Sequence, residues 1–277
     1  MQQFLLSKSD AMSIPKVIHY VWVGHAPKSE LVLRCIASWK KFLPDYDIIE
    51  WNNQALAHIQ HPYVQQAFAA EKWAFVSDYL RLYALYSMGG FYFDADLEVT
   101  ADLEPFRTHQ FVSGYEVYRG RPSPVTALMG AQKGSSLIAQ LLDLYREKSF
   151  VQPDGGLDLT PNTKLISQFF ATKFGLTKPY QYDQRSELCE GCWIYPSHYF
   201  CTPVAGKASF SIHHFNGSWM AEYSRKVLAK ISGYQLLKLK RNKVRSGDLP
   251  LLQGEQRMLH LGVTARYSLL LVKLQNS

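Results

Sequence analysis

The sequence predicts an α/β fold with one mostly parallel, doubly wound sheet. The chain has 277 residues and is 47% hydrophobic, which is enough apolar material for one large core. In its first half, short apolar runs that end at glycine or polar residues alternate with longer stretches of helical periodicity. This alternation is typical of a parallel sheet with helices on both faces. We expect residues 1–224 to form this domain.

The first half of the chain supplies the expected elements in order. Residues 16–23 form an apolar run that ends at Gly24, which predicts a buried strand. Ser29 is placed to cap a helix that extends to about residue 42. Residues 46–51 indicate a second strand, and Pro62 begins a further helix.

Residues 73–88 are apolar nearly all round, which predicts a buried helix. This helix nevertheless contains Asp78 and Arg81, whose spacing puts them on one side. Buried charges are unfavourable unless they are paired or bound to a ligand. Two interpretations stay open: the two side chains pair with each other as a structural bridge, or Arg81 faces a diphosphate while Asp78 accepts a hydrogen bond from a sugar hydroxyl.

A double glycine ends the helix, and an aromatic strand follows that runs into Asp94-Ala95-Asp96. Alternation along a strand would place Asp94 and Asp96 on the same side. Ligands of open α/β sheets bind beyond the carboxyl ends of strands. Two carboxylates that face one point repel each other unless a cation lies between them, and Mg²⁺ or Mn²⁺ suits such an oxygen-rich site.

The second half of the chain continues the alternation less regularly. We expect strands at 110–118, 125–132 and 209–214, and helices at 135–148 and 161–174. The C-terminal part shows two patterns that we interpret as helices, at 221–243 and 264–274.

The positive charge is concentrated at the C-terminal end. Residues 1–224 hold 19 Lys and Arg against 21 Asp and Glu, whereas residues 225–277 hold 11 against two, a net charge near +9. We interpret 225–277 as a basic helical extension that contacts an anionic membrane surface or the acceptor, with a solvated charged face as the alternative. Nucleic-acid binding would use the same charge, but the sequence has no recognised motif for it, and none is expected.

The sequence gives no sign of a membrane span or an export signal. It has no run of about 18 apolar residues, and its first 13 residues lack a signal-peptide pattern. We therefore expect a cytoplasmic protein, peripheral on the inner face of the membrane. Cys189 and Cys192, with His198 and Cys201 after them, are the residue types of a zinc site, but their spacing is unusual and we do not expect one.

Residues 74–96 resemble the core signature of glycosyltransferases with the DXD sugar-binding region. The signature joins the apolar helix, the double glycine, the aromatic strand and the acidic pair in that order. Residues 14–24 and 213–219 are similar to the first strand and a late motif of the same family. The family includes fungal initiating α-1,6-mannosyltransferases, α-1,4-galactosyltransferases and bacterial capsular polysaccharide enzymes, with the clostridial glucosylating toxins as distant relatives.

The resemblance implies a nucleotide-diphospho-sugar transferase fold of the glycosyltransferase A type, with one Rossmann-like sheet flanked by helices. It also implies a role for each matching residue. Trp22 stacks near the nucleobase, Asp78 and Arg81 hold the donor sugar and phosphates, Tyr92 and Asp94 contact the ribose or hexose, Asp96 ligates the metal, Asn162 lies beside the donor sugar, and Trp219 contacts the diphosphate. A histidine of the late motif completes the metal shell, and we prefer His214 over His213 because it is nearer the loop.

The function that the resemblance implies is transfer of a hexose, with retention of configuration, from a nucleotide-diphospho-sugar, preferably a UDP-sugar. Mn²⁺ or Mg²⁺ is the expected cofactor. The acceptor would be a glycan or lipid-linked glycan in surface polysaccharide or lipopolysaccharide synthesis. The alternatives are a toxin-like effector that glycosylates a host protein, and a non-catalytic protein that binds a sugar nucleotide or nucleic acid.

Overall fold

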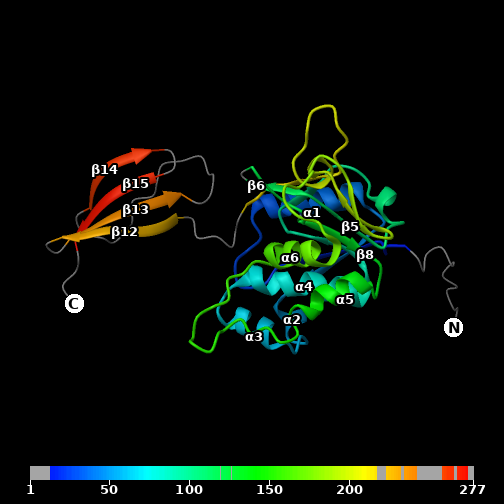
Figure 1. Ribbon diagram of the computed structural model, residues 1–277, viewed down its shortest axis with the longest axis horizontal. Coiled ribbons are helices and arrows are strands. Elements are labelled where there is room, and N and C mark those ends of the chain that lie inside the picture. The colour runs from blue at the N-terminus through cyan, green and yellow to red at the C-terminus, as the bar shows by residue number, and fades with distance from the viewer. Residues whose placement is uncertain are drawn as a thin grey trace. The chain divides into compact units, whose positions relative to one another are not determined.

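The computed structural model describes residues 13–118, 120–125 and 127–216 and, beyond them, four strands between residues 223 and 273 (Figure 1). The chain divides into two compact units, Met1–Phe215 and Asn216–Ser277.

The first unit is built on a seven-stranded sheet, and five of its strands run in one direction. The strand order is β2-β1-β3-β8-β5-β10-β9. β1 pairs in parallel with β2 and β3, and β10 pairs in parallel with β5, whereas β8 and β9 are antiparallel to their neighbours. The predicted mostly parallel α/β fold is confirmed. The bounds are β1 Val17–Val21, β2 Asp47–Trp51, β3 Gly90–Phe93, β5 Phe111–Gly114, β8 Leu128–Ala131, β9 Ser186–Cys189 and β10 Cys192–Tyr195.

The helices begin and end largely where the sequence places them. Ser29 caps the first helix by accepting a hydrogen bond from the amide of Val32, and Pro62 occupies the first turn of the third. The predicted helix at 135–148 is shorter in the structure and ends at Asp143. The bounds are α1 Glu30–Phe42, α2 Asn53–Leu56, α3 Pro62–Ala69, α4 Trp73–Met88, α5 Ser136–Asp143, α6 Asn162–Phe174 and α7 Ser197–Phe200, with a 3₁₀ turn at Glu104–Phe106.

Helices cover both faces of the sheet, and a separate apolar cluster fills each interface. One cluster joins the sheet to α3, α4, α5 and α6, and the other joins it to α1 and α7. Figure 1 shows α4, α5 and α6 together on one side and α1 on the other. All residues of β3 and β8 are buried, which explains why these central strands are apolar without alternation.

Two short strand pairs lie outside the main sheet. β4 Leu97–Val99 pairs with β11 Ser211–His213, and β6 Glu116–Tyr118 forms a hairpin with β7 Arg121–Ser123. The strand predicted at 110–118 is therefore two strands, β5 and β6, that belong to different sheets. The strand predicted at 125–132 is restricted to β8.

The second unit corrects the prediction of a helical extension. Its residues form a four-stranded antiparallel sheet in the order β12-β13-β15-β14. Leucines alternate with lysines at 237–240, a period of two that fits a strand, and only two residues join β12 to β13 and β14 to β15, as in hairpins. The bounds are β12 Tyr223–Ile231, β13 Tyr234–Arg241, β14 Met258–Thr264 and β15 Tyr267–Lys273.

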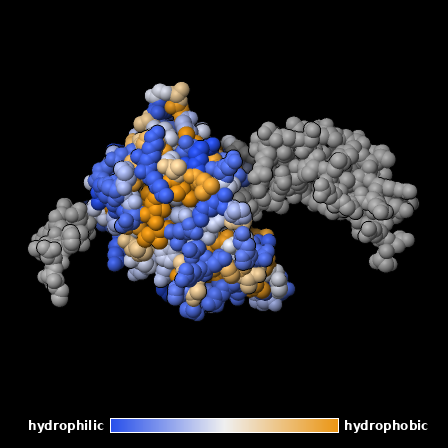
Figure 2. Space-filling view, turned by 180° about the vertical axis from the view of Figure 1, so that it is seen from behind, coloured by the Kyte–Doolittle hydropathy of each residue, from blue (hydrophilic) through white to orange (hydrophobic). Residues whose placement is uncertain are grey.

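The surface of the first unit is mixed in polarity. On the face that Figure 2 shows, hydrophilic residues surround smaller areas of hydrophobic ones. Over the described part of the chain, no helix combines the length and the apolar character that a membrane crossing requires.

Candidate active site

The acidic pair lies in a tight turn that directly follows β3. The amide of Leu97 donates to the carbonyl oxygen of Asp94 (2.9 Å), which closes the turn, and the amide of Asp94 donates to the carbonyl oxygen of Ala127 (2.8 Å). The two carboxylates converge because of this turn and not because they alternate along a strand, as the sequence had suggested. The position at the end of β3 is the one that the sequence predicts.

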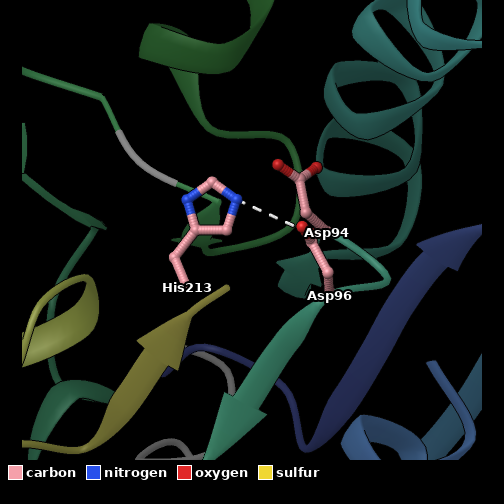
Figure 3. A group of neighbouring side chains, drawn as sticks. All are labelled: Asp94, Asp96 and His213. Atoms are coloured by element: carbon pink, nitrogen blue, oxygen red, sulfur yellow. Dashed lines mark ion pairs between the residues drawn. The ribbon is translucent and has the colours of Figure 1, made fainter. Parts of the chain in front are cut away.

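β11 brings a histidine to the acidic pair from more than 100 residues away. Antiparallel pairing of β4 and β11 places His213 opposite Leu97, next to Asp96. One ligand atom each from Asp94, Asp96 and His213 lie within 4.8 Å of one another. Figure 3 shows the imidazole pointing at the acidic pair, with Nε2 of His213 3.5 Å from Oδ1 of Asp96. This donor set of two carboxylates and one imidazole could hold a divalent cation.

The neighbouring histidine makes a different contact. Nε2 of His214 lies 2.7 Å from Oε2 of Glu98, and Glu98 is also 3.6 Å from Nε of Arg34. The geometry therefore favours His213 over His214 as the histidine of a metal site, which reverses the preference drawn from the sequence.

Arg81 lies between two carboxylates in the interior of the site. Its Nη2 is 3.1 Å from Oδ1 of Asp94 and 3.3 Å from Oδ1 of Asp78, and the side chain is 8% exposed. Its guanidinium lies 4.6 Å from the ring centroid of Tyr92, whose side chain is buried in β3. The i, i+3 bridge is therefore formed, and the same guanidinium connects it to the acidic pair.

Asn162, at the first residue of α6, is joined to Asp78 by two hydrogen bonds. Its amide donates to Oδ2 of Asp78 (3.0 Å), and its Nδ2 donates to the Asp78 carbonyl oxygen (3.2 Å). Two buried atoms beside these bonds, Oδ1 of Asn162 and Nε of Arg81, have no hydrogen-bond partner in the structure. One is an acceptor and the other a donor, so a hydroxyl group is a suitable partner for either atom.

The electrostatics of the site are dominated by buried carboxylates. Burial raises the pKa of Asp78 to about 6, although Arg81 opposes the shift. Burial also raises the pKa of Asp94, again against the effect of Arg81. Burial alone would lower the pKa of His213, but hydrogen bonding to Asp96 and other neighbours raises it well above its usual value. Raised pKa values of buried carboxyl groups show that their negative charge is unfavourable there, and a bound cation would stabilise it.

The double glycine before β3 is required by the backbone. Gly89 and Gly90 have φ of 70° and 107°, and a Cβ on Gly90 would lie 2.5 Å from the carbonyl oxygen of Val17. The carbonyl oxygen of Gly89 lies 2.8 Å from Nε2 of His19, a buried histidine of β1. This close packing fixes where β3, and with it the acidic turn, begins.

The resemblance to the family implies that two tryptophans, Trp22 and Trp219, contact the nucleotide-sugar donor. Trp22 directly follows β1, the strand beside β3, and therefore lies at the same edge of the sheet as the acidic turn. Its indole nitrogen donates to the carbonyl oxygen of Ala26 (3.0 Å), and Nζ of Lys28 lies 5.9 Å from its ring centroid. Trp219 lies outside the described residues.

One acidic residue of the site was missed by sequence reasoning. Oε2 of Glu116, on β6, lies 3.4 Å from Nδ1 of His213. A single glutamate in a short strand carries no sequence signal, because only the fold brings it to the histidine. Within the described ranges, Asp94, Asp96 and His213 are the one group of metal-ligand type.

Comparison with known proteins finds a family match for the segment that carries Asp78, Arg81, Asp94 and Asp96. Residues 29–112 match the glycosyltransferase sugar-binding region containing the DXD motif. No curated protein matches the chain significantly. Among solved structures, the PaToxG glycosyltransferase is 21% identical over 59% of this chain and 70% of its own, with a TM-score of 0.41. A glycosyltransferase involved in glycosylation of the major capsid of PBCV-1 is 11% identical over 73% of this chain and 95% of its own, with a TM-score of 0.39.

Proposed function

We propose that this member of the glycosyltransferases with a DXD sugar-binding region transfers a hexose from a nucleotide-diphospho-sugar to a glycan acceptor, with retention of configuration and with a divalent metal as cofactor. The observation that carries the proposal is the convergence of Asp94, Asp96 and His213 beside the buried Arg81–Asp78 pair. Candidate metal ligands thus lie next to polar groups suited to a sugar, and Asp78, Arg81, Asp94 and Asp96 belong to the segment that matches the family, whereas His213 comes from β11.

The donor set favours Mn²⁺ over Mg²⁺. Asp96 and His213 would hold the ion, with Asp94 as a third ligand or as the contact to the sugar. Carboxylate oxygens suit both ions, but imidazole is a better ligand for transition metals than for Mg²⁺. A bound divalent ion would supply charge stabilisation to the departing diphosphate.

Arg81 would hold the carboxylates of Asp78 and Asp94 in place. It lies within hydrogen-bond distance of both Asp78 and Asp94, so it offsets their mutual repulsion and fixes their orientation. The unpaired Nε of Arg81 would donate to a hydroxyl or phosphate oxygen of the donor substrate, and the unpaired Oδ1 of Asn162 would accept from a hydroxyl group. A UDP-sugar is the donor that we propose to test first.

The acceptor that we propose is a glycan, free or lipid-linked, of a surface polysaccharide or lipopolysaccharide. The support is the charge of residues 225–277, which carry 11 Lys and Arg against two acidic residues. Such a surface would attract the enzyme to anionic lipid, where lipid-linked acceptors reside.

The test is a screen of UDP- and GDP-sugars for hydrolysis and transfer, with Mn²⁺, with Mg²⁺ and with a chelator. We expect release of the nucleoside diphosphate from at least one donor with Mn²⁺ and none with the chelator. Proton NMR of the first product should show the anomeric configuration of the donor. Donor binding without any turnover would instead identify a non-catalytic sugar-nucleotide-binding protein, and inversion would refute the proposed stereochemistry.

A further inference from the structure

We propose that Glu116 is a positioning residue that holds the imidazole of His213 in the orientation and tautomer needed to bind the metal through Nε2. The inference rests on the proposed function, because it assumes that the acidic pair and His213 form a metal site. It assigns a role to β6–β7, a hairpin outside the segment that matches the family.

The two ring nitrogens of His213 face two different carboxylates. Nε2 lies 3.5 Å from Oδ1 of Asp96, on the side of the acidic pair, and Nδ1 lies 3.4 Å from Oε2 of Glu116. The histidine side chain is 10% exposed and that of Glu116 is 18% exposed, so neither is freely solvated. A neutral imidazole that ligates a metal through Nε2 carries its proton on Nδ1, and this buried N–H then needs an acceptor.

Glu116 is the carboxylate that faces Nδ1 of His213. At 3.4 Å the contact with Nδ1 is an ion-pair distance rather than a formed hydrogen bond, and Nδ1 has no other hydrogen-bond partner in the structure. Hydrogen bonds of catalytic groups are often long in structures without substrate and tighten in the complex. A carboxylate that accepts the second N–H of a metal-bound histidine fixes its tautomer and raises its basicity.

The strand that carries Glu116 also contacts the aromatic cover of the histidine. The ring of Phe215 lies 4.1 Å from that of His213, centroid to centroid, and the ring of Tyr118 lies 5.2 Å from that of Phe215. Glu116 and Tyr118 are two residues apart on β6 and so lie on the same face of the strand. Phe215 has a φ of 49°, a strained backbone state for a bulky residue. The hairpin and Phe215 together restrict rotation of the imidazole.

The neighbouring pair of Glu98 and His214 supplies a matched control. It is also a carboxylate–histidine contact, at 2.7 Å, and it involves the adjacent histidine and the strand β4. Neither residue belongs to the group that could hold a metal. Removal of the Glu98 charge should therefore leave the metal site unchanged.

The experiment measures Mn²⁺ binding to the full chain by the electron paramagnetic resonance signal of free Mn²⁺, without donor. Wild type is compared with Glu116→Ala, Glu116→Gln and Glu98→Gln. We expect Glu116→Ala to weaken Mn²⁺ binding about 10- to 100-fold. We expect a smaller loss in Glu116→Gln, because an amide oxygen still accepts the Nδ1 proton, and a change of less than about twofold in Glu98→Gln. Melting curves in chelator check that each variant is folded under the conditions of the binding measurement.

A double-mutant cycle with His213→Ala tests whether Glu116 acts through the histidine. In the His213→Ala background, Glu116→Ala should have no further effect on Mn²⁺ affinity. Equal losses in the alanine and glutamine variants that persist without His213 would overturn the inference, because Glu116 would then act only as a distant negative charge. Wild-type Mn²⁺ affinity in Glu116→Ala would also overturn it and would leave the proposed function intact. Failure of the wild-type chain to bind Mn²⁺ would refute both.

Discussion

Replacement of Arg81 by methionine should destabilise the first unit strongly, and by an amount that depends on pH. Methionine preserves most of the side-chain length but removes the cation that lies 3.1 Å from Asp94 and 3.3 Å from Asp78. Loss of one partner from a buried ion pair costs about 3–5 kcal/mol, because an uncompensated charge stays buried. We expect a loss of this size in the free energy of unfolding near pH 7.5.

The loss should shrink as the pH is lowered. Burial already raises the pKa of Asp78 to about 6 in the presence of Arg81, and removal of the cation would raise it further. Protonation then neutralises the buried carboxylate, which limits the cost of the missing cation. Urea unfolding in chelator at pH 7.5 and 5.5 measures the effect, and tryptophan fluorescence is a suitable signal because five of the six tryptophans precede residue 216.

The matched control is Arg34→Met. Arg34 is 60% exposed and lies 3.6 Å from Glu98, so its removal should change stability by less than about 0.5 kcal/mol. If Arg81→Met unfolds at the same urea concentration as wild type and loses only donor affinity, Arg81 is a phosphate ligand and not the cation that stabilises the two carboxylates.

Three further predictions follow from the site, the core and the C-terminal unit. Asp96→Asn should abolish metal-dependent turnover and leave the fold intact, because an amide cannot supply the charge; near wild-type activity would refute its role as a metal ligand. Burial lowers the pKa of His19, so the unfolded chain takes up its proton first and stability falls as the pH drops below 6.5. His19→Gln should reduce this fall by up to about 1.4 kcal/mol per pH unit in urea unfolding, and an unchanged slope would contradict the assignment. The chain should sediment with anionic but not with neutral liposomes, and high salt should weaken this binding. Charge reversal at four C-terminal basic residues should reduce the binding without affecting donor hydrolysis. Equal sedimentation with both kinds of liposome would refute the prediction. The four are Lys238, Lys240, Arg241 and Lys243.

The parts of the fold that local patterns determine were predictable from the sequence. The helix at 73–88 has the predicted bounds, because a predominantly apolar stretch ends at two glycines whose positive φ other residues rarely adopt. The strands β1 and β3 follow from continuous apolar runs, since both lie inside the sheet. The proximity of Asp94 and Asp96 also follows, although a turn and not strand alternation produces it.

The parts that depend on distant pairing were not predictable in the same way. His213 reaches the acidic pair only because β11 pairs with β4, and nothing near residues 213–214 in the sequence distinguishes the two histidines. Glu116 meets His213 through a hairpin whose strands are three residues long, too short for a periodic pattern. In the C-terminal part, the closely spaced leucines and lysines fit both a helix and a strand. The two-residue connection between β12 and β13 is typical of a β-hairpin and therefore favours strands.

The central claim is that Asp94, Asp96 and His213 hold one divalent metal ion. The most direct measurement is the stoichiometry and affinity of Mn²⁺ binding to wild type, His213→Ala and His214→Ala, by the free Mn²⁺ resonance signal. The account predicts one site in wild type, a loss of at least about tenfold in affinity for His213→Ala, and wild-type affinity for His214→Ala. Strong loss in His214→Ala with normal binding in His213→Ala would contradict it.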